Sequence, residues 1–214
     1  MNHFIKIFSS ISKIKLQSWI FILVIIGAAF LISLTPKKDK QKQNTTKKLT
    51  YGSICIALSF VLSYIRFFKM PQGGSITAGS MLPVMLFAYW FGPADGVIAG
   101  MVYGLLQFIQ DPFIARLRLK FFLDYPLAFG ALGLAGLSKK NFSLSLAIGT
   151  IFRFLFSFLS GTLFFVEYAK QVGEAPVVYS LAYNSVILID GLICIAISLI
   201  PQFKSAINRV KSRI

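Results

Sequence analysis

The chain has 214 residues, of which 56% are hydrophobic, 15% aromatic and only 14% charged, and its mean hydropathy is +0.74. About one quarter of the residues in a soluble globular protein are charged, so this composition argues against a soluble enzyme and against intrinsic disorder. Lys and Arg total 22 against 7 Asp and Glu, a formal charge of +15. Because these bases flank long apolar runs, anionic headgroups and the positive-inside rule explain them better than nucleic-acid binding. The sequence predicts an all-α integral membrane protein.

The sequence lacks the common catalytic, metal-binding and nucleotide-binding patterns. His3 is the only histidine, and Cys55 and Cys194 lie inside apolar runs, which indicates helix-packing cysteines and neither a disulfide nor a zinc site. No G-x-x-x-x-G-K-[ST], G-x-S-x-G or H-E-x-x-H pattern occurs. We therefore predict no cofactor, no metal and no enzymatic activity, and expect a partner or an ion gradient to drive any uphill work.

Seven apolar runs are long enough, or nearly so, to cross a bilayer. A helix spans the roughly 30 Å hydrocarbon layer with about 20 apolar residues. The third and fourth runs are short, and the sequence Phe91-Gly92-Pro93-Ala94 between them predicts a tight turn joining two helices. The expected spans are 17–34, 50–68, 75–91, 95–110, 121–138, 143–165 and 179–200.

The first run stands apart from the other six, because a polar linker with six lysines follows it. We expect an uncleaved extra N-terminal helix; a signal peptide is the alternative. Three segments result: residues 1–49 with the extra helix and linker, a six-helix domain at 50–200, and a basic tail at 201–214. The lysine-rich linker and the tail predict a multi-pass membrane protein with a cytoplasmic C-terminus.

Small residues predict close helix packing at several places. Gly92, Gly96, Gly100 and Gly104 recur every four residues on one helix stripe, which lets a neighbouring backbone approach closely. The 121–138 run is also rich in glycine and alanine, which predicts a helix in the middle of the bundle. On the first core helix, the small residues Ser53 and Ala57 face either a sister helix or another protein.

Two ionisable residues are predicted near the bilayer midplane. Arg153 lies 10 residues past the inner end of its expected helix, and Asp190 lies 10 residues before the inner end of its own. At roughly 1.5 Å per residue, both lie about 15 Å deep. Because isolated charges are costly at that depth, we expect a structural ion pair; a proton or substrate relay is the alternative.

A carboxylate, aromatic rings and an amide gather at the outer ends of the last three expected helices. Such a set favours a flat, cationic, hydrogen-bonding small molecule, held by stacking, cation–π attraction and the carboxylate. Helix capping is the alternative role for the carboxylate. The members are Asp124 and Tyr125 of the fourth core helix, Ser157 and Phe165 of the fifth, and Tyr179, Tyr183 and Asn184 of the sixth.

Four stretches resemble the thiamine-specific substrate-binding subunits (S components) of energy-coupling factor transporters. These are MPQGGSITAGSMLPVML (70–86), VYGLLQF (102–108), LDYPLAFGALGLAGL (123–137) and YSLAYN (179–184). The resemblance implies a six-helix membrane protein that captures a vitamin at its extracellular end. It also implies docking on a transmembrane coupling subunit that two cytoplasmic ATPases drive, with Ser53 and Ala57 matching the small residues that face the coupling subunit.

The resemblance also implies a set of binding residues. Asp124-Tyr125 match the acidic residue and tyrosine that engage polar and charged groups of thiamine, and Tyr179 and Asn184 match a Tyr and an Asn of the family. Three positions depart from the family pattern: Asp124 stands for Glu, Ser157 for His, and Phe165 for the Trp of some members. The ligand expected is thiamine, or else a close relative such as a pyrimidine precursor.

Two other functions compete with vitamin capture. A stand-alone secondary carrier for a heteroaromatic vitamin or precursor would use Arg153 and Asp190 for ion coupling and would transport without ATPases. A structural or assembly protein would use the glycine stripe to pack a partner and would show no affinity for small molecules.

Overall fold

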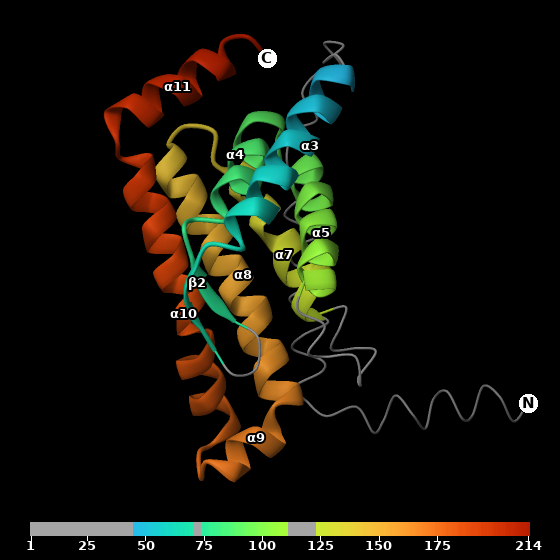
Figure 1. Cartoon of the computed structure of the whole chain (residues 1–214), viewed down its shortest axis with the longest axis vertical. Coiled ribbons are helices and arrows are strands. Elements are labelled where there is room, and N and C mark those ends of the chain that lie inside the picture. Colours follow the sequence, from blue (N-terminus) through green and yellow to red (C-terminus); the bar gives the residue numbers. More distant parts are fainter. Residues whose placement is uncertain (1–44, 71–73, 111–122) are drawn as a thin grey trace, which may run out of the picture. The chain divides into compact units, whose positions relative to one another are not determined.

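Long helices make up most of the computed structural model, which describes residues 45–70, 74–110 and 123–214 (Figure 1). The described residues belong to one compact unit. The expected extra helix at 17–34 and most of its lysine-rich linker lie outside the described residues. The mostly helical architecture agrees with the all-α prediction, although several of the expected spans differ in their ends.

The two longest helices, α8 (Phe142–Phe164) and α10 (Pro176–Ser198), lie side by side (Figure 1). Local sequence signals mark the start of both helices. The side chain of Asn141 accepts hydrogen bonds from the first turn of α8, and Pro176 occupies the first turn of α10. Within the described residues, these two helices are long and apolar enough to cross a membrane by length and composition. Most of their apolar surface is not buried inside the protein, as expected for helices that contact lipid.

The expected spans at 50–68 and 75–91 are wrong in one respect, because a β-hairpin replaces the end of one and the start of the other. Helix α3 (Thr45–Leu62) stops early, and strands β1 (Arg66–Lys69) and β2 (Ser75–Thr77) pair antiparallel before α4 (Leu82–Phe91) begins. The strands include the apolar residues Phe67, Phe68 and Ile76, which extend the neighbouring apolar runs, so hydropathy alone did not show where helix gives way to strand. Strand β2 is held by contacts to α10 that come from distant sequence, as described below.

The glycine stripe packs within the chain, as predicted. Gly96, Gly100 and Gly104 lie on α5 (Pro93–Gln110), which contacts the segment Leu123–Leu137. Gly92 was expected on the same helix but lies in the turn before it, with a φ of +105°, and a Cβ there would meet no backbone. A Cβ atom at Gly100 would overlap the carbonyl oxygen of Phe129, and one at Gly133 would overlap the backbone of Val97. The two backbones are therefore in direct contact, and side chains at these positions are excluded.

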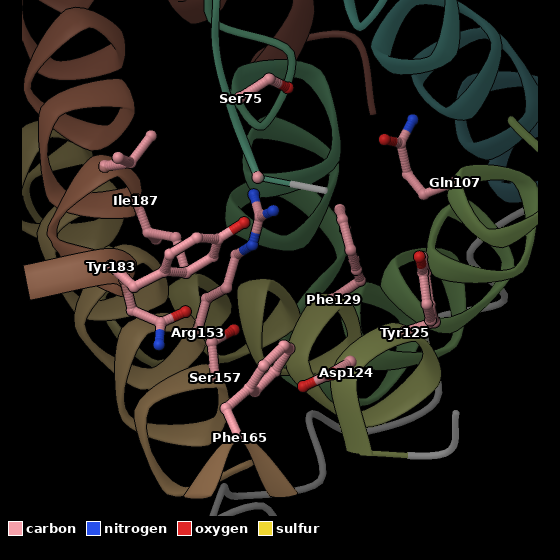
Figure 2. Close-up of a pocket in the computed structure, with 13 residues that line it drawn as sticks. Ser75, Gln107, Asp124, Tyr125, Phe129, Arg153, Ser157, Phe165, Tyr183 and Ile187 are labelled. Carbon is pink, nitrogen blue, oxygen red and sulfur yellow. The ribbon is translucent and has the colours of Figure 1, made fainter. Parts of the chain in front are cut away.

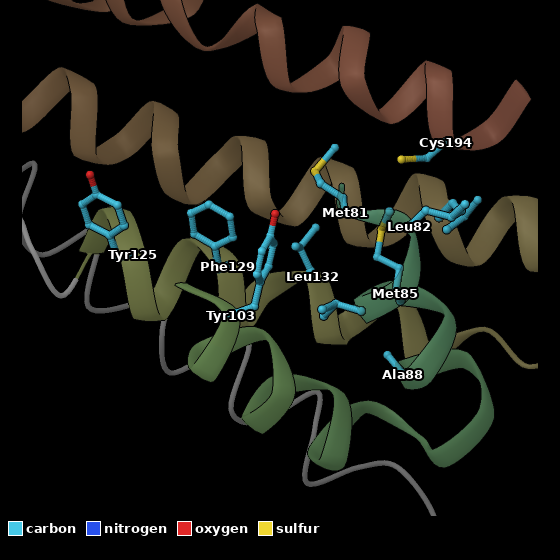
Figure 3. Packing of buried hydrophobic residues seen from close by; sticks show 12 residues of the cluster. Met81, Leu82, Met85, Ala88, Tyr103, Tyr125, Phe129, Leu132 and Cys194 are labelled. Carbon is cyan, nitrogen blue, oxygen red and sulfur yellow. The ribbon is translucent and has the colours of Figure 1, made fainter. Parts of the chain in front are cut away.

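The segment Leu123–Leu137 is an irregular helix in the middle of the bundle. It starts as a π-helix η1 (Leu123–Leu127) that contains a proline, continues as α7 (Ala128–Gly130) and ends as a 3-10 helix η2 (Ala131–Leu137). Its buried face meets α4 and α5 in the main apolar cluster (Figure 3). Cys55 and Cys194 are free and buried, which confirms the prediction of packing cysteines.

The basic tail expected at 201–214 contains a further helix, α11 (Pro201–Lys211). Its apolar residue Ile207 is buried, and Lys211 donates a hydrogen bond of 2.9 Å to the hydroxyl of Tyr89. At the same end of the bundle, Lys48 Nζ lies 2.7 Å from Asp95 Oδ2. This pair is about one third exposed, at 31% and 32%, so it adds little to stability. The tail is thus attached to the helical unit.

Candidate functional site

A pocket of about 850 Å³, including its open mouth, lies between η1, α8, α10 and the β-hairpin (Figure 2). The irregular start of the Leu123–Leu137 helix turns two of its residues toward this space, while α8 and α10 supply the opposite wall. The lining residues are Gly74, Ser75, Gln107, Asp124, Tyr125, Phe129, Arg153, Ser157, Phe165, Tyr183, Asn184, Val186 and Ile187.

Of the seven residues in the predicted set, Tyr183 and five of the other six line this one pocket. Asp124 and Tyr125 come from η1, Ser157 and Phe165 from α8 and its C-terminal cap, and Asn184 from α10. Positions separated by up to 60 residues therefore meet around one space. The sixth, Tyr179, does not line the pocket; its ring stacks on Tyr183, with the centroids 5.9 Å apart and the planes at 23°.

Aromatic rings form two walls of the pocket. Phe165, which caps α8 just before the short helix α9 (Val166–Gln171), stacks with Tyr183 at 6.2 Å between centroids and 26° between planes. On the other wall, the rings of Tyr125 and Phe129 are 6.4 Å apart and nearly parallel, at 8°. These rings give the pocket aromatic side chains on two sides, beside the aliphatic Val186 and Ile187.

Arg153 lines the pocket. Its guanidinium carbon lies 4.0 Å from the centroid of the Phe129 ring, and its Nε is buried without a hydrogen-bond partner among the described residues. The ion pairs between described residues do not include Arg153 with Asp190. Arg153 and Asp190 are close enough for their charges to interact, although no salt-bridge contact joins them. The hairpin supplies Asp190 with hydrogen-bond partners, which depth along a helix cannot reveal, and the structural ion pair stays a prediction.

Those partners come from Thr77 of β2. The backbone N–H of Thr77 donates to Asp190 Oδ1 at 3.1 Å, and its hydroxyl lies 2.9 Å from Oδ1 and 3.1 Å from Oδ2. Both residues are 3% exposed. Asp190 is thus buried and hydrogen-bonded to the hairpin.

Asn184 is oriented by a short network between α8 and α10. Its amide nitrogen donates to the backbone oxygen of Ser180 at 2.9 Å, and the Ser180 hydroxyl donates to the backbone oxygen of Phe158 at 2.7 Å. Gly161 permits this close approach, because a Cβ there would overlap the Ser180 hydroxyl. No described residue donates to the amide oxygen of Asn184, which leaves an oriented acceptor at the pocket wall.

The charged groups of the pocket lie at different levels. Figure 2 shows Asp124 beside Phe165 at one end, with the guanidinium of Arg153 directed away from it, between Tyr183 and Phe129. The pocket thus offers an anionic end and a cationic end, with aromatic faces between them. The described residues contain no group of three His, Cys, Asp or Glu side chains that is arranged to hold a metal ion.

Sequence reasoning missed part of the lining. The β-hairpin residues Gly74 and Ser75 lie within the stretch 70–86 that carried the family resemblance, but they were not assigned to the site, and Ser75 was expected to begin a helix. The sequence did contain a signal for Arg153, because Arg153 precedes Ser157 by four residues and therefore lies on the same face of α8. Gln107 and Phe129 lie within stretches that carried the family resemblance, but no role had been assigned to them.

The two residues predicted to face a partner lie away from the pocket, on α3. Ser53 and Ala57 are both exposed, and four large apolar side chains are exposed on the same helix, namely Leu49, Ile54, Leu58 and Val61. The alternative of packing against a sister helix within the chain is not what the described residues show at these two positions.

Known proteins resemble this chain along most of its length. Residues 49–209 match the family described as "Thiamine transporter protein (Thia_YuaJ)". The Bacillus subtilis (strain 168) protein named "Thiamine transporter ThiT" is 30% identical over 178 residues, which cover 75% of this chain and 92% of that protein.

Two solved structures share the fold at 22% sequence identity. The ThiT structure from Listeria monocytogenes has a TM-score of 0.63 and covers 75% of this chain and 98% of its own. A structure described as the S component of a bacterial ECF transporter has a TM-score of 0.51 and covers 78% and 99%. From the family match over residues 49–209 and the Bacillus relative, the chain belongs to the thiamine transporter protein family, whose members are membrane transport proteins and not enzymes.

Proposed function

We propose that this chain captures thiamine in the pocket between η1, α8 and α10, as the S component of an energy-coupling factor transporter. The observation that carries the proposal is the pocket itself. The pocket combines a carboxylate, two aromatic walls and an oriented amide oxygen, and the chain that holds it belongs to a thiamine transporter family. Thiamine has a cationic thiazolium ring, an aminopyrimidine ring and a hydroxyl group, and each finds a complementary partner in this set.

The thiazolium ring is assigned to the end of the pocket that holds Asp124. A carboxylate attracts the cation directly, and the faces of Phe165 and Tyr183 attract it through their π electrons. The opposite end is unfavourable for a cation, because Arg153 carries a positive charge there. Electrostatics therefore set the direction in which thiamine lies.

The aminopyrimidine ring is assigned to the end that holds Arg153. Its ring nitrogens are hydrogen-bond acceptors, and the guanidinium of Arg153, which lines the pocket, is a hydrogen-bond donor. Its exocyclic amino group is a donor, which suits the amide oxygen of Asn184. Ser157 lies four residues after Arg153 and contributes a hydroxyl to the same wall. Tyr125 adds a ring face opposite, and Tyr179 supports Tyr183 from behind.

The partners are proposed from the same class of transporter. The exposed small-residue patch Ser53 and Ala57 on α3 suits close approach of another helix, and we assign it to the transmembrane coupling subunit that two cytoplasmic ATPases drive. The C-terminus, with α11, is placed on the cytoplasmic side because of its basic residues. The extra N-terminal helix at 17–34 is retained outside the six-helix domain 50–200 in this proposal.

Calorimetric titration of the purified full chain tests which small molecule the protein binds. We expect saturable binding of thiamine, with weaker binding of the isolated pyrimidine precursor and of oxythiamine, in which a carbonyl replaces the amino group. Binding of another vitamin with thiamine inactive would overturn the assignment.

One substitution in the aromatic wall gives a measurable effect. Phe165→Leu keeps an apolar side chain of similar size but removes the ring that stacks with Tyr183. We expect about three- to tenfold weaker thiamine binding, since aromatic pairs contribute about 0.5–1.5 kcal/mol beyond their buried area. Phe154→Leu on α8 is the control, because Phe154 does not line the pocket. Equal effects of the two changes would contradict the assignment.

Uptake into proteoliposomes tests the partners. We expect thiamine accumulation only when a coupling subunit, its ATPases and ATP are present together with this chain. Replacing Ala57 by Leu on the exposed face of α3 should lower uptake while leaving binding unchanged. Accumulation by the chain alone would instead favour a secondary carrier.

A further inference from the structure

Asp190 is the buried carboxylate for which the binding mechanism above has no use. It lies in α10, one turn beyond the pocket residues Val186 and Ile187. It is 3% exposed and accepts hydrogen bonds from both the amide and the hydroxyl of Thr77. A carboxylate buried at such a place is costly unless it is hydrogen-bonded. Asp190 therefore ties one specific segment, the second strand of the hairpin, to α10.

The tied segment forms part of the pocket wall. Gly74 and Ser75 line the pocket, and Thr77 follows Ser75 by two residues in strand β2. The strand is short, from Ser75 to Thr77, and pairs only with β1. A two-stranded hairpin has little stability of its own in water, so the position of this wall depends on what holds the strand.

The attachment extends beyond one bond. The Thr77 hydroxyl also accepts the backbone hydrogen of Ser80 at 3.0 Å, which joins the strand to the turn that precedes α4. In that turn Gly79 has a φ of +83°, and a Cβ there would be 3.1 Å from Ile197 on α10. Thr77 therefore connects three segments, because it lies in the strand, bonds to Asp190 of α10 and accepts a hydrogen bond from the turn before α4.

We infer that Asp190 is a positioning residue for the ligand: through Thr77, it holds the Gly74–Ser75 wall against the pocket and slows release of the bound molecule. Asp190 does not line the pocket itself. This inference takes the identity of the ligand from the proposed function. The position of the pocket wall does not depend on that identity.

Hydrogen exchange and ligand release, measured on the full chain in lipid nanodiscs, test the inference. Thr77→Val keeps the shape of the side chain and removes the hydroxyl, and Asp190→Ala removes the acceptor. We expect exchange of the amides at 74–77 to rise about tenfold in both variants and thiamine to dissociate about tenfold faster, as for loss of a hydrogen bond to a charged group. Thr77→Ser should behave like the unsubstituted chain.

Thr162→Val is the matched control. Thr162 is also a buried threonine, but its hydroxyl donates only to Phe158 within its own helix. Unchanged exchange at 74–77 in Thr77→Val would overturn the inference, as would faster exchange with unchanged release of thiamine. If the unsubstituted chain does not bind thiamine, the proposed function fails, whereas the exchange measurement still decides whether Asp190 holds the wall. Should Asp190→Ala not fold, Thr77→Val alone carries the test.

Discussion

Replacing Gly133 by alanine is expected to destabilise the protein by about 3 kcal/mol or more, at the upper end of what overpacking costs. A Cβ at this position would overlap backbone atoms of Gly96 and Val97 on α5. A flexible side chain could rotate away, but backbone atoms move only if the two helices separate. Such separation would open the contact between α5 and the Leu123–Leu137 segment, which forms part of the main buried cluster.

The thermal unfolding midpoint of the purified protein measures this effect, and Gly130→Ala is its control. Gly130 lies one turn earlier on the same segment, but the nearest atom to a Cβ there is the side-chain Cγ of Met101, at 3.0 Å. Methionine has several rotatable bonds and adapts to small changes in its surroundings. We expect a much smaller loss of stability for Gly130→Ala. Equal midpoints for the two variants would show that the backbones do not meet as described.

Replacing Asp124 by asparagine is expected to weaken thiamine binding by about ten- to a hundredfold. The change keeps the size of the side chain and removes its negative charge, and interactions with a charged group contribute about 1.5–3 kcal/mol. A neutral analogue that lacks the thiazolium charge should lose much less affinity than thiamine does. Calorimetric titration of both ligands measures the difference between the two losses.

Asp95→Asn is the matched control for this substitution. Asp95 is also a carboxylate in the first turn of a helix, but it pairs with Lys48 and does not line the pocket. Its neutralisation should leave binding unchanged. Equal losses for thiamine and the neutral analogue in Asp124→Asn would argue that Asp124 shapes the pocket and does not attract a cation.

Much of the candidate site was predictable from local sequence. Asp124 and Tyr125 follow each other in the chain, and Ser157 lies one helical turn from Arg153. Phe165 and Asn184 were expected at the same membrane level because each lies near the outer end of a long apolar run. All of these residues line the pocket. For Arg153, Ser157 and Asn184 the reason is that a regular helix converts position in the chain into depth and direction.

The partners of the buried charges were not predictable in this way. Depth along the helices placed Arg153 and Asp190 at one level and suggested that they pair. In the structure, Thr77 bonds to Asp190, and Arg153 lies over the ring of Phe129. The depth of a residue along its helix does not show which residues of other segments lie beside it and bond to it.

The amino-acid sequence by itself determined the membrane class, the long helices α8 and α10, and most of the residues around the pocket, since hydropathy and helical period are local properties. Only the tertiary structure decided that Arg66–Lys69 and Ser75–Thr77 pair as strands, that Thr77 bonds to Asp190, and that Tyr179 stacks on Tyr183 and does not line the pocket. Each of these depends on a contact between segments distant in the chain. The two strands are joined by their own backbone pairing, and Thr77 joins them to α10 through Asp190.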